Sequence, residues 1–69
     1  MTKVDAIVLV MKDNGGKASW KTIYSQIGKY YKGYKASEQW QAGIRGVLYR
    51  EIRNGRTFRK VADATFALI

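Results

Sequence analysis

The C-terminal stretch TFRKVADATFALI, residues 57–69, decides the fold of this chain. Two runs rich in aromatic and β-branched residues, 57–61 and 65–69, flank the short segment 62–64. Such residues favour strands, and two strands with a short connection between them form a hairpin. We therefore predict a small β-hairpin over about residues 57–69, and the fold class depends on the elements that precede it.

Two predicted helices, each beginning with a serine, precede the hairpin. Ser19 and Ser37 are residues that favour the N-cap of a helix, and apolar residues recur at helical spacing after each of them. These apolar stripes are Trp20, Ile23, Tyr24, Ile27 and Tyr31 after the first serine, and Trp40, Ile44, Val47, Leu48 and Ile52 after the second. The pattern predicts helices over about residues 19–32 and 37–53.

The N-terminal segment, residues 2–12, is apolar at helical spacing but also on its other faces, so a strand competes with a helix there. Two features favour the helix. Thr2 and Asp5 have the spacing of a capping box, and Asn14 followed by Gly15 is suited to a left-handed helix end. We therefore predict a helix over about residues 2–12.

A chain of 69 residues has room for one domain, and we predict a single domain over residues 1–69. Its expected fold class is mainly α with a small β-hairpin: three helices closed by a terminal hairpin. Lys17 and Ala18 are too few to assign, but they are compatible with a short extended piece that pairs elsewhere. This order of elements is the layout of a winged helix-turn-helix domain.

The composition indicates a polyanionic partner and argues against catalysis. Thirteen Lys and Arg residues against five Asp and Glu give a formal net charge of +8. Because the chain has no histidine and no cysteine, and its acidic residues are scattered, we expect no enzymatic activity, no metal site and no cofactor. The apolar run 6–11 is too short to span a bilayer, so we expect an intracellular protein of the cytoplasm or nucleoid.

The segment GIRGVLYREI, residues 43–52, together with FRKV at 58–61 and TFAL at 65–68, resembles the HARE-HTH family. The chain is also similar to winged-helix domains of some restriction endonucleases, including methylation-dependent ones. The resemblance covers nearly the whole chain. It implies a winged helix in proteins of DNA modification, chromatin or transcription, with the third helix contacting DNA. It also raises two hypotheses: that the domain senses a modified, such as methylated, base, and that it serves a parent enzyme or transcription complex.

The tip of the hairpin departs from these relatives. They often carry a Gly-Arg-Gly type tip, whereas residues 62–64 here read Ala-Asp-Ala. An acidic residue at the tip, Asp63, should avoid phosphate. We therefore expect any contact between the wing and DNA to come from Arg56, Arg59 or Lys60.

The leading hypothesis is a double-stranded DNA-binding domain, with the third helix in the major groove and the basic wing strands on the backbone. In the major groove glutamine pairs with adenine and arginine with guanine, while lysine, arginine and hydroxyl groups bind phosphate. The candidates for base contacts are Gln39, Gln41, Ala42, Arg45 and Tyr49. The candidates for backbone contacts are Lys29, Lys32, Lys35, Ser37, Arg50, Arg53, Arg56, Arg59 and Lys60.

Two alternatives stay open. The acidic wing tip and the glycine-containing third helix are compatible with a protein-interaction winged helix of a transcription or chromatin complex. Tyr30 and Tyr34, interleaved with lysines, are compatible with stacking on unpaired bases of a single strand or RNA. The sequence indicates neither the oligomeric state nor the DNA sequence that would be bound.

Three residues of the predicted third helix require a physical explanation. Gly43 and Gly46 each cost about 0.5 to 1 kcal/mol relative to alanine. We expect Gly43 to pack against another helix and Gly46 to let a partner approach closely. Glu51 falls beside the apolar stripe, where a bare carboxylate is expensive, so we expect it in an ion pair.

Overall fold

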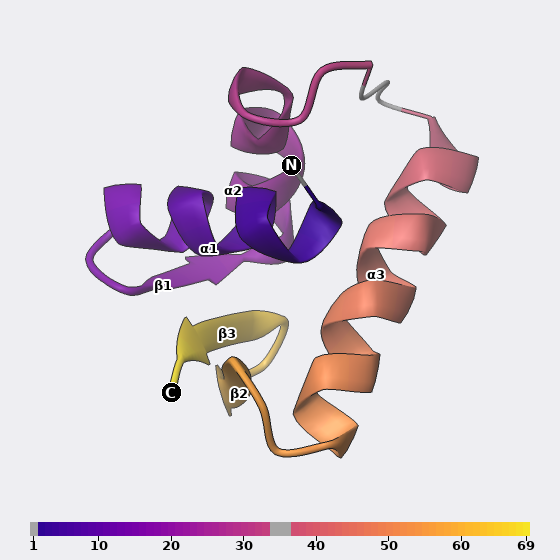
Figure 1. Ribbon diagram of the computed structural model, residues 1–69. Coiled ribbons are helices and arrows are strands. Elements are labelled where there is room, and N and C mark those ends of the chain that lie inside the picture. The colour runs from indigo at the N-terminus through magenta and orange to yellow at the C-terminus, as the bar shows by residue number, and fades with distance from the viewer. Residues whose placement is uncertain (1, 34–36) are drawn as a thin grey trace.

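The computed structural model describes residues 2–33 and 37–69. The elements follow in the order α1 (Lys3–Asp13), β1 (Lys17–Ser19), α2 (Trp20–Gln26), the 3-10 helix η1 (Ile27–Lys29), α3 (Glu38–Arg53), β2 (Phe58–Ala62) and β3 (Thr65–Leu68). The described part of the chain is mainly helical, with an antiparallel sheet (Figure 1). The predicted combination of three helices and a terminal hairpin is confirmed.

The N-terminal segment is the helix α1, and the capping box predicted for it is present. The Thr2 hydroxyl accepts from the backbone N–H of Asp5 at 3.1 Å, and the Asp5 carboxylate accepts from the backbone N–H of Thr2 at 3.2 Å. At the other end Asn14 is the C-cap, and Gly15 and Gly16 have φ of 75° and 90°. Glycine adopts this conformation without strain, so the chain turns directly into β1.

The second helix is shorter than the predicted range 19–32. Ser19 caps it as expected, but α2 ends at Gln26, and η1 follows. There the carbonyl of Ile27 accepts from the backbone N–H groups three and four residues further on, at 3.0 and 2.8 Å, and the chain leaves the helix. Tyr31 nevertheless packs against the core. The apolar spacing in the sequence therefore extends to Tyr31, because the turn after η1 keeps this side chain on the buried side, as another turn of helix would.

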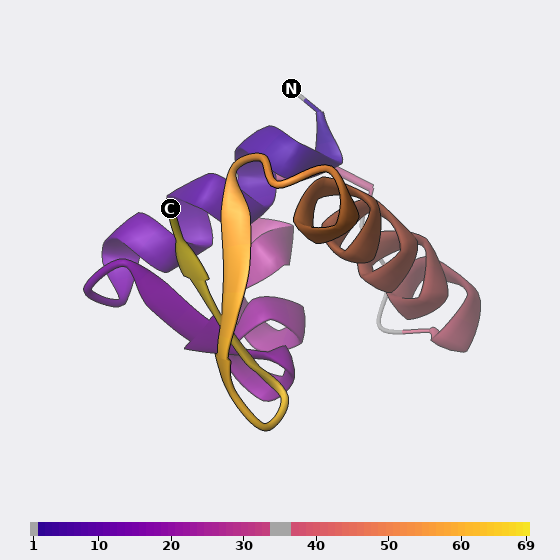
Figure 2. The same ribbon diagram turned by 90° about the horizontal axis from the view of Figure 1, so that it is seen from below.

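Strand β3 lies in the middle of the sheet, which has the order β1-β3-β2. Ala67 of β3 is flanked by Lys17 on β1 and by Arg59 on β2. The short segment before α2, which the sequence left unassigned, is thus the edge strand β1 (Lys17–Ser19). The register between β2 and β3 shifts after Lys60, so that Ala62 pairs with Thr65, and this irregularity precedes the connection between the two strands. Figure 2 shows β2 and β3 running side by side to that connection.

The hairpin tip, residues 62–64, is fastened to the body of the molecule. Ala64 has φ of +50°, a conformation that residues other than glycine, asparagine and aspartate seldom adopt. Its carbonyl accepts from the backbone N–H of Trp20, the first residue of α2, at 3.1 Å. The tip is therefore held against the start of α2 rather than projecting freely.

The hydrophobic core lies between the helices and one face of the sheet. Its fully buried large side chains are Ile7, Val10 and Met11 of α1, Ile23, Ile27, Ile44 and Leu48 of the later helices, and Phe58 and Phe66 of the hairpin. Figures 1 and 2 both show α3 standing beside the layer that α1, α2 and the sheet form. One long face of α3 is consequently left without a covering element.

A polar contact ties the end of α1 to η1. The Tyr30 hydroxyl donates to the carboxylate of Asp13, whose oxygen also lies 3.7 Å from the Lys29 ammonium. Lys29 sits over the Tyr30 ring, 5.6 Å from its centroid. The three side chains therefore form one exposed cluster between the two elements.

We expect Asp13→Asn to lower the pKa of Tyr30. The hydrogen bond to Asp13 raises that pKa above its usual 10.0, and partial burial and the charge of the carboxylate act in the same direction. The contact therefore contributes stability below about pH 10, and this contribution is lost as the pH rises through the raised pKa of the folded protein. An alkaline NMR titration of the Tyr30 ring checks the shift. Identical curves for the two proteins would contradict it.

Candidate nucleic-acid interface

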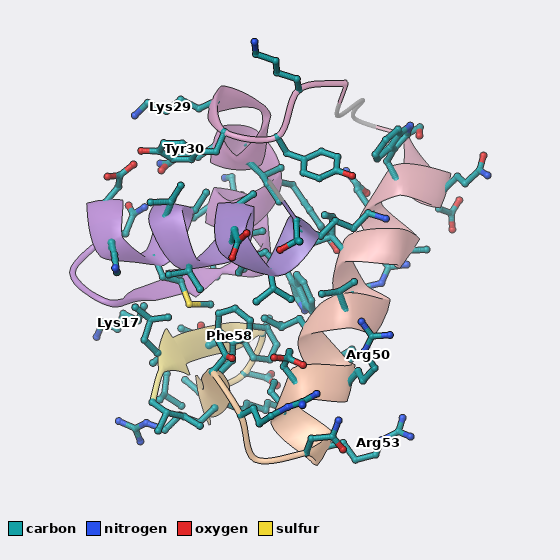
Figure 3. The ribbon with its side chains drawn as sticks, in the orientation of Figure 1. Lys17, Lys29, Tyr30, Arg50, Arg53 and Phe58 are labelled. Atoms are coloured by element: carbon teal, nitrogen blue, oxygen red, sulfur yellow. The ribbon has the colours of Figure 1, made fainter. Side chains whose placement is uncertain are left out.

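The helix α3 has a buried face and an exposed one. Ile44, Leu48 and Glu51 are buried against the rest of the molecule. The outer face of α3 is made by its exposed residues of the opposite side: Gln39, Ala42, Gly46, Tyr49, Arg50 and Arg53. Figure 3 shows Arg50 and Arg53 directed away from the body of the molecule. None of these six side chains is acidic, and Glu38, the first residue of α3, is exposed one turn before Ala42.

Small residues lie in the middle of the outer face. A Cβ placed on Gly46 would meet nothing within 4 Å, so no contact in the described chain accounts for this glycine. A Cβ on Gly43 would lie 3.7 Å from the Lys3 ammonium, in ordinary contact with α1. Gly43 therefore lies beside α1, but a Cβ would fit there, so helix packing does not require this glycine. Gly46 and Ala42 are exposed and leave the backbone of α3 accessible from outside.

The residues predicted to contact bases fall into two groups. Gln39, Ala42 and Tyr49 are exposed on the outer face, as expected. Gln41 and Arg45 are half-buried at its edge.

Arg45 has a partner on α2. Its Nη1 donates to the Tyr24 hydroxyl oxygen at 3.1 Å. The sequence pattern assigned Tyr24 to the apolar stripe and gave it no functional role. Phenylalanine would fill the same place in the core equally well, so the hydroxyl of Tyr24 was the one sign in the sequence that this residue has a polar partner.

Aromatic packing fixes the surroundings of this hydrogen bond. Trp20 stacks on Tyr24 with ring centroids 5.5 Å apart and an interplanar angle of 15°. The same indole makes edge contacts with Tyr49 at 5.7 Å and with the buried Phe66 at 4.8 Å. Trp20 thus joins α2, α3 and β3, and Tyr49, which is 48% exposed, extends the cluster onto the outer face.

Four of the predicted backbone contacts are exposed on two elements. Arg50 and Arg53 lie on the outer face of α3, and Arg59 and Lys60 lie on β2. Asp63, at the hairpin tip between β2 and β3, is also exposed. The four cations are available to a polyanion, and the tip carries the opposite charge.

Other residues predicted to contact the DNA backbone have partners within the protein or lie apart from these four cations. Figure 3 places Lys29 across the molecule from Arg50, in the cluster with Asp13. The Ser37 hydroxyl accepts from the backbone N–H of Trp40 at 3.4 Å as the N-cap of α3. Lys32 is exposed just after η1, and Lys35 lies outside the described residues.

Arg56 is held by Glu51, which is the ion pair expected for that carboxylate. Glu51 is only 9% exposed, and one of its oxygens accepts from the Arg56 guanidinium at 3.1 Å. The other accepts from the Thr57 hydroxyl at 3.0 Å. The pair closes the connection from α3 to β2, where Thr57 has φ of +64°.

Comparisons with family models, curated proteins and solved structures gave no significant match. Within residues 2–33 and 37–69, no helix has both the length and the apolar character needed to cross a membrane. The functional evidence is accordingly the surface itself: the outer face of α3, the cations of β2 and the Tyr24–Arg45 contact beside them.

Proposed function

We propose that the chain is a winged helix-turn-helix domain that binds double-stranded DNA. The order α1, β1, α2, α3, β2, β3 and the hairpin at the end of the chain support this assignment. In helix-turn-helix proteins the second helix of the motif lies in the major groove and contacts base edges. In this chain α3 is that helix, and the hairpin β2–β3 is the wing.

The outer face of α3 carries the proposal. The major groove of B-DNA admits an α-helix, and a close fit requires small side chains on the inserted face. Ala42 and Gly46 supply these, Gln39 near the start of the helix presents an amide suited to adenine, and Arg50 and Arg53 supply charge for phosphates. No contact within the described chain gives Gly46 another purpose.

The wing contributes backbone contacts through its strands in this proposal. Arg59 and Lys60 are exposed on β2, while Asp63 would repel phosphate from the tip. The bond between Ala64 and Trp20 holds the hairpin beside α2. A wing held in this way favours contact with the backbone flanking α3 over deep insertion of the tip into a groove.

Salt dependence tests this function. If the four exposed cations of α3 and β2 meet phosphates, a plot of log affinity against log salt concentration should have a slope of about −3 to −4. Fluorescence anisotropy of a labelled duplex, titrated at several salt concentrations, measures the slope. A flat response contradicts the proposal. Preference for an unpaired oligonucleotide in competition supports the single-strand alternative, and no binding to nucleic acid favours a protein partner.

The modified-base hypothesis is a narrower form of this proposal, and the resemblance to domains of methylation-dependent endonucleases supports it. Its test is a selection of bound sequences from a random duplex pool, followed by titration of the selected duplex with and without cytosine or adenine methylation. Equal affinities for the two forms would remove the hypothesis and leave DNA binding intact.

A further inference from the structure

The contact between Arg45 and Tyr24 joins the middle of α3 to α2. Arg45 lies at the edge of the outer face and is half-buried, and its Nη1 donates to the Tyr24 hydroxyl oxygen at 3.1 Å. A free arginine side chain samples many rotamers, and ordering them opposes binding. An arginine that is already held in one orientation avoids part of that loss.

The Tyr24 hydroxyl is a fixed point because its ring is held on the core. The ring stacks on Trp20, which in turn packs against the fully buried Phe66 at 4.8 Å between centroids. A tyrosine ring has few rotatable bonds, so this packing determines where its oxygen lies. The position of the Arg45 guanidinium is thereby linked to the core through two aromatic rings.

The partner of Arg45 is neutral, which distinguishes it from the other held arginine. Arg56 is paired with the carboxylate of Glu51 at 3.1 Å. Among residues 2–33 and 37–69, Asp13 pairs with Lys29 and Glu51 pairs with Arg56, and Arg45 forms no ion pair. A phenol orients a guanidinium without placing a negative charge beside it. Arg45 is therefore both oriented and electrostatically available to DNA.

The donors of Arg45 suffice for a base contact as well. A guanidinium has five N–H donors in a planar fork, and the bond to Tyr24 uses one of them. Two of the others can bind O6 and N7 of guanine together, which is the commonest specific arginine contact in the major groove. The acceptor at Tyr24 decides which edge of the fork is left for the base.

We propose that Tyr24 is a specificity-determining residue that positions Arg45 to recognise guanine. This proposal rests on the proposed function. Tyr24 itself touches no base in this scheme. It acts through Arg45, next to Gly46, where the backbone of α3 is open to a close approach.

The test variant is Tyr24→Phe, which keeps the ring and its stacking on Trp20 and removes only the hydroxyl. The matched control is Tyr31→Phe, which removes a hydroxyl from another half-buried tyrosine. Each protein is titrated with its selected guanine-containing duplex, with variants of that duplex in which a single guanine pair is replaced, and with a random duplex.

We expect Tyr24→Phe to lose about tenfold of the preference for guanine at one position, while its affinity for random duplex and its salt slope stay unchanged. Arg45→Ala should lose the preference at the same position, and the double variant should lose no more than Arg45→Ala alone. Tyr31→Phe should keep the preference. A merely structural role for Tyr24 would weaken binding to all duplexes equally and would overturn the proposal, as would additive losses in the double variant.

The free protein gives a second readout that separates the possible failures. The Arg45 guanidinium should show slowed rotation by NMR in the wild type and in Tyr31→Phe, but not in Tyr24→Phe. Equal rotation in the wild type and Tyr24→Phe overturns the positioning role alone. Failure of the wild type to bind any duplex overturns the proposed function, and the role of Tyr24 with it.

Discussion

Replacing Glu51 with alanine is expected to lower the free energy of unfolding by about 3 kcal/mol. Its carboxylate is almost fully buried and accepts hydrogen bonds from both Arg56 and Thr57. Hydrogen bonds to charged groups contribute about 1.5 to 3 kcal/mol each. The side chain of Arg56 is 62% exposed, so water solvates its charge once the carboxylate is gone, which places the loss at the lower end of the range for buried ion pairs.

Thermal and urea unfolding measure this effect. For a domain of this size 3 kcal/mol corresponds to a decrease of about 15 °C in Tm. The control is Glu38→Ala, the same substitution at an exposed position of the same helix, where only the favourable charge at the helix N-terminus, about 0.3 to 1 kcal/mol, is lost. A loss at Glu51 no larger than that at Glu38 would show that the pair does not stabilise the connection from α3 to β2.

The double variant Arg50→Glu, Arg53→Glu is expected to bind duplex DNA about a hundredfold more weakly than a control of equal net charge. Both arginines lie on the outer face of α3 (Figure 3). Reversing their charge there replaces attraction to phosphates with repulsion. The control is Lys12→Glu, Lys29→Glu, because both lysines are exposed and Figure 3 places Lys29 across the molecule from Arg50. The two variants have the same net charge, so a difference between them reports location.

Anisotropy titration at one salt concentration measures both affinities, and circular dichroism verifies that both variants are folded. Equal weakening would mean that binding follows total charge and that α3 has no special part in it. A greater loss in the Lys12, Lys29 variant would move the interface to α1 and η1.

The sequence predicted the elements well where a local rule applied. The serine N-caps, the capping box at Thr2 and the glycine turn at Gly15 act within a few residues, and each is present. The hairpin followed from its aromatic and β-branched residues. The end of α2 was placed too far along the chain, because Tyr31 is packed on the core without belonging to the helix.

The candidate site was predicted less completely, since it depends on packing between distant residues. The phase of α3 identified its exposed face, but the partner of Arg45 lies 21 residues earlier in the chain. The sequence made Lys29 a candidate for a contact with the DNA backbone, whereas the fold turns it toward Asp13. Helical phase gives the side of one helix on which a residue lies, and it does not give the neighbour that the fold brings there.

The position of β2 at the edge of the sheet has a consequence for the behaviour of the protein in concentrated solution. An edge strand offers unpaired backbone groups with which the edge of another copy can pair. Arg59 and Lys60, exposed on this strand, oppose such pairing by charge repulsion between copies. The cations proposed to hold DNA thus also keep the free domain from aggregating through its own sheet.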